Sequence, residues 1–126
     1  MENQTAEKLE ARGKEFVLPN GKLFVSYATA EVGIALFTAA TDLLSKSSIS
    51  KGTPDSELFV LLNSNEIIRK LVMEECSKSA SYNSRKVNSM LFNDPHIGNK
   101  ACKDYAAIFT AIFAWNFSRF SSGSSA

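Results

Sequence analysis

The sequence predicts a mainly α-helical single domain, a compact bundle of about five helices with a small β-hairpin near the amino terminus and a buried carboxy-terminal helix. Three observations favour this class. Apolar residues recur at helical spacing through most of the chain. One Asn-Gly reversal between apolar triplets occurs in residues 16–25. The chain has 126 residues, of which 44% are hydrophobic and 21% charged, as is typical of one globular domain.

Composition divides the chain into three parts. Residues 1–13 are expected to form a polar arm, because Leu9 is their one large apolar residue apart from Met1. Residues 14–120 form the predicted helical domain. Residues 121–126 are small and polar, so we expect a flexible tail there.

The hairpin is predicted over residues 16–25, on either side of Pro19-Asn20-Gly21. Asn-Gly supplies the positive φ angles that a tight reversal needs. An isolated two-stranded hairpin is marginal in water. We therefore expect it to rest on the helical body as a flap that closes one end of the core, in preference to pairing with another chain.

Several helices are expected before the carboxy-terminal one. They span residues 28–47, 54–62, 63–79 and 84–92. Gly33 lies within the first and indicates a close approach by another helix, since it costs about 1 kcal/mol relative to Ala. Pro54 and Asn63 mark helix starts, and Pro95 stops the fourth helix. The polar residues 77–84 are predicted to be a linker.

The carboxy-terminal helix, residues 99–120, is expected to be the most buried element. Its section 105–117 contains no charge, and bulky residues recur there at three- and four-residue steps on more than one face. A membrane span needs about 20 apolar residues. Lys103, Asp104 and Arg119 flank this shorter run, so we expect no stable membrane span.

Cysteine and histidine content argues against metal, cofactor and catalytic sites. Cys76 and Cys102 are too few and too far apart for a disulfide framework or a zinc site, and His96 is the single histidine. We expect free thiols, no cofactor and a cytoplasmic location, because residues 1–18 lack the apolar stretch of a secretory signal. The sequence predicts a protein that is not an enzyme. A small enzyme using Cys102 and His96 is the remote alternative.

Charge is distributed unevenly although the net charge is only +1. Residues 1–75 contain eight Lys or Arg against eleven Asp or Glu, whereas residues 76–126 contain six against two. The carboxy-terminal half is therefore the better candidate for an anionic partner.

The sharpest candidate site is the basic segment 78–103, which flanks two predicted helix starts where backbone N–H groups attract phosphate. Its candidate nucleic-acid-binding residues are Lys78, Tyr82, Arg85, Lys86, Lys100 and Lys103. We expect the cations to contact phosphates and Tyr82 to stack on a base of RNA or another single strand. The alternative is that these residues are the solvated side of two helices and a loop.

Self-association is the second expectation. Nine Phe residues in so short a chain favour burial of some apolar surface between subunits. The sequence thus predicts a non-enzymatic binding and assembly protein that self-associates and contacts nucleic acid through segment 78–103. The alternative function is a protein–protein interaction or regulatory helical module without nucleic-acid binding.

Overall fold

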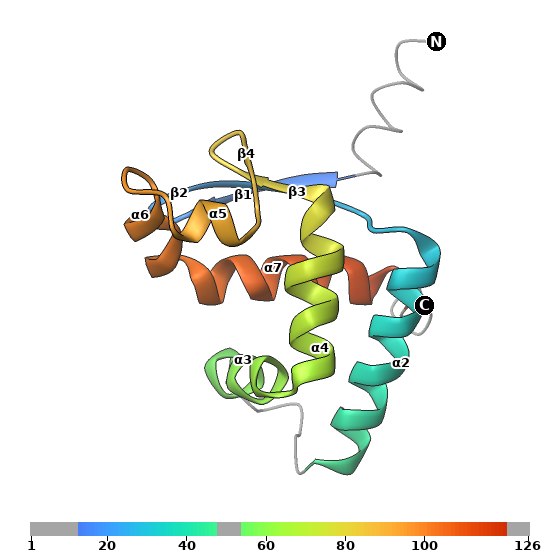
Figure 1. Ribbon diagram of the computed structural model, residues 1–126. Helices are drawn as coiled ribbons and strands as arrows, with labels where there is room; N and C mark the ends of the chain where they lie inside the picture. The colour runs from blue at the N-terminus through green and yellow to red at the C-terminus, as the bar shows by residue number, and fades with distance from the viewer. Residues whose placement is uncertain (1–12, 48–53, 121–126) are drawn as a thin grey trace, which may run out of the picture.

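A four-stranded antiparallel sheet lies over a layer of helices (Figure 1). The computed structural model describes residues 13–47 and 54–120, and this part contains six α-helices. The predicted mainly α-helical class with a small hairpin is therefore wrong, because two further strands extend the hairpin into a sheet. The predicted tail 121–126 lies outside the described residues, as does the predicted arm except for Gly13, which begins the first strand.

The sheet follows the order β1-β2-β3-β4. Its strands are β1 (Gly13–Leu18), β2 (Gly21–Ser26), β3 (Ala80–Tyr82) and β4 (Arg85–Lys86). The first two form the expected hairpin, whose last pair is Leu18 with Gly21. The predicted linker 77–84 contains β3, which pairs with β2 along its whole length. This strand forms because Ala80 and Tyr82 alternate with Ser81 and are buried.

The two hairpin turns differ in backbone conformation. In the described residues, positive φ angles occur only at Asn83 (48°) and Ser84 (69°), in the turn between β3 and β4. The positive φ angles predicted for Asn20-Gly21 are therefore wrong. Pro19 occupies the first turn position there, and its ring fixes φ near −65°.

The helices were only partly predicted. Their bounds are α2 (Ala30–Lys46), α3 (Asp55–Ser64), α4 (Glu66–Lys70), α5 (Ser89–Phe92), α6 (Gly98–Lys103) and α7 (Tyr105–Ser118). Helix α4 begins after Asn65, whose side chain accepts a hydrogen bond from the Ile68 N–H at 3.0 Å. The predicted start at Asn63 is therefore wrong, because α3 continues through Asn63 to Ser64.

Helix α4 continues without a break into a π-helical segment, Leu71–Glu75, and a 3₁₀ segment, Cys76–Ser79. We call the whole of 66–79 the bulged helix. Ile68, Val72 and Cys76 are all completely buried. Residues four apart drift around a regular α-helix of 3.6 residues per turn, whereas the wider π turn keeps them on one face.

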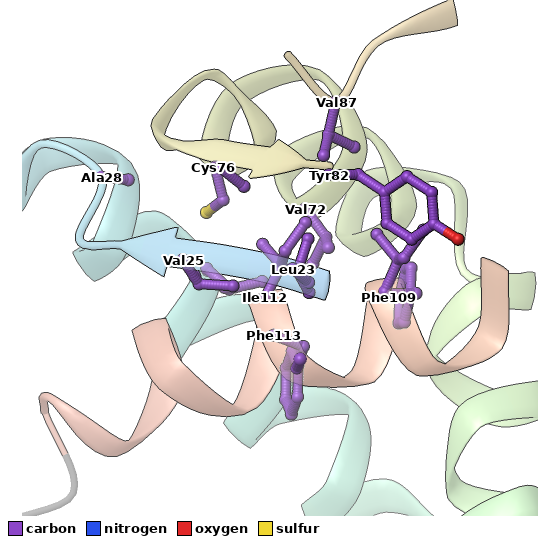
Figure 2. Close-up of a cluster of buried hydrophobic side chains, with 14 of the residues drawn as sticks. Leu23, Val25, Ala28, Val72, Cys76, Tyr82, Val87, Phe109, Ile112 and Phe113 are labelled. Carbon is purple, nitrogen blue, oxygen red and sulfur yellow. The ribbon is translucent and has the colours of Figure 1, made fainter. Parts of the chain in front are cut away.

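The predicted helix 99–120 is divided in two at Asp104, which lies between α6 and α7. Helix α7 is the central helix, and its buried residues are Ile108, Phe109, Ala111, Ile112, Phe113 and Asn116. It crosses beneath the sheet and also contacts α2, α3 and the bulged helix (Figure 1). Figure 2 shows Leu23 and Val25 of β2 above Ile112 of α7 in this core. None of the described helices has the length and apolar character needed to cross a membrane.

Candidate anion-binding groove

A groove of about 840 Å³ lies between the bulged helix and the segment from β4 to α5. Its volume is within the range of about 300–1,000 Å³ that is typical of ligand sites. The bulged helix lines one side with Arg69, Met73, Glu74, Ser77 and Lys78. Lys86, Val87, Asn88, Ser89 and Phe92 line the other side, together with Tyr105 at the start of α7.

Three cationic side chains line the groove. Arg69 donates from Nη1 to the carbonyl oxygen of Asn63 at 3.2 Å. Lys78 forms an ion pair with Glu75 at 3.3 Å, in which the two side chains are 71% and 44% exposed. Such exposed pairs contribute little stability, so an anionic ligand can replace the Glu75 carboxylate at small cost. Within residues 13–47 and 54–120, Lys86 forms no ion pair.

Two half-buried aromatic rings line the same groove. Phe92 and Tyr105 pack edge to face, with ring centroids 5.7 Å apart and planes at 73°. The Tyr105 hydroxyl donates to Asn63 Oδ1 at 2.6 Å. Burial raises the pKa of Tyr105, and the nearby Arg69 charge opposes that shift. Tyr105 therefore remains a neutral hydrogen-bond donor, and no negative charge arises there to repel an anion.

Tyr82 does not belong to the groove. Its side chain is completely buried and lies in the core beside Phe109 (Figure 2). The hydroxyl donates to Asp104 Oδ2 at 2.8 Å. Burial, followed by this hydrogen bond and the Asp104 charge, raises the Tyr82 pKa. The prediction that Tyr82 stacks on a base is therefore wrong, because no face of its ring is accessible.

Arg85, which is predicted to contact phosphate, does not line the groove either. It forms an ion pair with Asp94 at 2.6 Å. Asp94 also accepts hydrogen bonds from the backbone N–H groups of His96 (2.7 Å) and Ile97 (3.0 Å). The Ile97 and His96 hydrogen bonds, more than Arg85, lower the Asp94 pKa to about 2. Arg85 thus joins β4 to the loop between α5 and α6. The Asp94 carboxylate in that loop partly neutralises its charge.

The structure brings Lys78 and Lys86 together in one groove. Lys100 and Lys103 are exposed on α6 and do not line it. Arg69, Glu74, Phe92 and Tyr105 also line the groove, and the sequence pattern does not predict them as site residues. Arg69 and Glu74 lie within the predicted helix 63–79, and the π-helical segment Leu71–Glu75, which has no simple sequence signal, changes the direction in which side chains after Lys70 point.

The described residues hold no group of three His, Cys, Asp or Glu side chains placed as metal ligands are. Cys102 Sγ, the thiol of the remote enzyme alternative, is 3.6 Å from the carbonyl oxygen of Phe92 and donates to it. The expectation that the protein is not an enzyme stays a prediction. Comparison with known proteins finds no similar family, no similar curated protein and no similar solved structure.

Proposed function

We propose that this protein is a non-enzymatic binding and assembly protein whose groove binds a single strand of nucleic acid, with RNA as the preferred ligand. The observation that supports this most is the lining of the groove, which includes Arg69, Lys78 and Lys86 together with the aromatic side chains of Phe92 and Tyr105. Proteins that bind single strands combine cations with aromatic side chains, because the cations contact the phosphates and the aromatic rings stack on the unpaired bases.

The mixture of groups favours a single strand over other anions. A small inorganic anion makes no favourable contact with the apolar side chains of Met73 and Phe92, which also line the groove. A duplex hides its bases in the stack and presents mainly phosphates and groove edges. An unpaired nucleotide offers phosphate to the lysines and a base to the apolar side.

The second part of the proposal is self-association. Six large apolar side chains of the described residues are exposed: Val17, Phe24, Ile34, Val60, Ile67 and Met90. Val17 and Phe24 lie on the outer face of the sheet, since their pairing partners Lys22 and Glu15 are exposed as well. This outer face also favours the alternative function, a module that binds another protein and no nucleic acid. The free thiols of Cys76 and Cys102 agree with an intracellular location.

The test is fluorescence anisotropy with a short labelled RNA without secondary structure, titrated with wild-type protein and with a Lys78→Glu/Lys86→Glu variant. We expect the reversal to weaken binding by at least about tenfold at low salt. It should also reduce the slope of log affinity against log salt by about 0.7 for each lost phosphate contact. Phosphate contacts have no base code, so unrelated sequences should lose affinity together.

The matched control is Lys46→Glu/Lys70→Glu, which makes the same change of charge on α2 and α4. These lysines pair with Asp42 and Glu66 and do not line the groove. Equal losses of RNA affinity in the two variants would show that the effect comes from the overall charge of the protein and not from the groove. An absence of binding at low salt would reject the nucleic-acid proposal and leave protein–protein assembly. Light scattering on the same samples measures the mass, and a strictly monomeric mass would reject self-association.

A further inference from the structure

Glu74 is the one carboxylate among the residues that line the groove. It follows Arg69 and precedes Lys78 on the bulged helix, so this side presents a cation, a carboxylate and a cation in order. With about 1.5 Å of rise per residue, Arg69 and Lys78 are separated by about 13 Å along the axis. A carboxylate midway between them repels a phosphate at that level.

We propose that Glu74 reads a base, and that the groove therefore prefers single strands that contain guanine. This inference rests on the proposed function. The Glu74 carboxylate repels the phosphates of a strand held by Arg69 and Lys78. The group of that strand that it can bind is therefore a base, whose edge has the hydrogen-bond donors that a carboxylate needs. An ionised carboxylate accepts through both oxygens and donates nothing.

The Watson–Crick edges of the four bases differ in what they offer a carboxylate. Guanine presents two adjacent donors, N1–H and the N2 amino group, which match the two oxygens of Glu74. Cytosine and adenine present one amino donor beside a ring-nitrogen acceptor, and uracil presents one N–H between two carbonyl oxygens. Unpaired bases are read on these edges in single strands, and a well-formed bidentate pair discriminates by about 1–3 kcal/mol.

The rest of the groove fits a base held at this level. Met73 and Phe92 provide apolar contact, and Asn88 and Ser89 provide hydrogen-bonding groups on the side opposite the bulged helix. In the described residues Glu74 is exposed and has no ion pair, whereas its neighbour Glu75 pairs with Lys78. The Glu74 oxygens are therefore open to a ligand.

The experiment compares four labelled RNA heptamers that differ only in the central base, placed among uridines so that no structure forms. Wild-type protein should bind the guanine heptamer at least about fivefold more tightly than the other three, which is the lower bound for one bidentate pair. Glu74→Gln should reduce that preference to within about twofold, because an amide offers only one acceptor. Glu66→Gln is the matched control, since Glu66 pairs with Lys70 on the same helix outside the groove.

A heptamer with inosine in place of guanosine tests the same contact without altering the protein. Inosine keeps N1–H and lacks the N2 amino group, so wild-type protein should bind it more weakly than guanosine, and Glu74→Gln should not distinguish the two. Equal binding of all four bases, or a guanine preference that survives Glu74→Gln, would overturn the inference and leave the proposed function standing. Failure to bind any heptamer would reject the proposed function, and this inference with it.

Discussion

Asp104 connects three parts of the chain through hydrogen bonds to one buried carboxylate. It accepts from the Asn20 backbone N–H at 3.0 Å, from Asn20 Nδ2 at 2.9 Å and from the Tyr82 hydroxyl at 2.8 Å. Burial of a carboxylate is costly unless it is hydrogen-bonded. Its place just before α7 adds the favourable field of a helix amino terminus. The turn of the first hairpin is thereby attached to the central helix.

Asp94 is a residue whose ionisation contributes to stability. The hydrogen bonds from Ile97 and His96 hold its pKa at about 2, below the ordinary value of about 3.9. A depressed carboxyl pKa contributes stability above the ordinary pKa, and that contribution is lost as the pH falls through the folded-state pKa. Asp94 therefore stabilises the fold fully above about pH 5 and progressively less toward about pH 2.

We expect Asp94→Ala to lower the free energy of unfolding at neutral pH, and the difference from wild type to shrink as the pH falls from about 5 to about 2. Urea unfolding at a series of pH values measures this. Arg85→Ala is the control, because it removes the ion pair and keeps the two backbone hydrogen bonds, so it should leave most of the pH-dependent contribution in place. A difference that stays constant over this pH range would contradict the assignment.

At the scale of elements, the turn between β3 and β4 stores backbone strain. Asn83 accepts the positive φ of its position more readily than Ser84, since a short amide side chain tolerates the left-handed region. Asn83 Oδ1 also accepts from the Lys22 backbone N–H at 2.9 Å, and the Asn83 N–H donates to the Lys22 carbonyl oxygen at 2.8 Å. The turn is thus fixed to β2 despite the strain at Ser84.

Ser84→Gly should stabilise the protein by about 1 kcal/mol, because glycine has no Cβ to oppose a φ of 69°. Ser81→Gly is the matched control in β3, where the backbone is extended. It should destabilise by about 0.5–1 kcal/mol. Thermal unfolding of both variants measures the two effects, and a loss of stability in Ser84→Gly would show that the turn is not strained as described.

The same elements show what the sequence predicts and what it does not. The uncharged run 105–117 and the triplets around Pro19 were sufficient to predict a buried helix and a hairpin, because both depend on local patterns. Strand β3 is only three residues long, and its partner β2 lies more than fifty residues earlier in the chain. No local pattern indicates such a pairing, so the polar composition of residues 77–84 predicts a linker and the sequence indicates a smaller sheet than the one observed.

The candidate site was predicted less well than the fold, for a related reason. Lys78 and Lys86 were identified by charge, and they share the groove because β3 and β4 bring the chain back past the bulged helix. Tyr82 lies within the polar residues 77–84 and is predicted to stack on a base, whereas alternation in β3 turns its side chain inward. Phe92 and Tyr105 lie in predicted helices, and composition alone does not distinguish a groove side chain from a core one.

In the whole molecule α7 lies beneath the sheet and contacts α2, α3 and the bulged helix, and the bulged helix also contacts the sheet directly (Figure 1). The outer face of the sheet is open and has exposed Phe24 and Val17. The opposite side of the sheet is filled by the core (Figure 2). The groove lies where the bulged helix, β4 and α5 meet, and its cations come from two neighbouring segments that β3 and the turn after it bring face to face.

The central claim is that ligand binding occurs in this groove. The most direct measurement is ¹H–¹⁵N NMR of the labelled protein during titration with an unlabelled single-stranded RNA. We expect the largest backbone shift changes at Met73, Glu74, Ser77, Lys86 and Asn88, with little change at Phe24 on the outer sheet face or at Lys100 and Lys103 on α6. Changes concentrated at these latter residues, or no changes at a ligand excess, would contradict the claim.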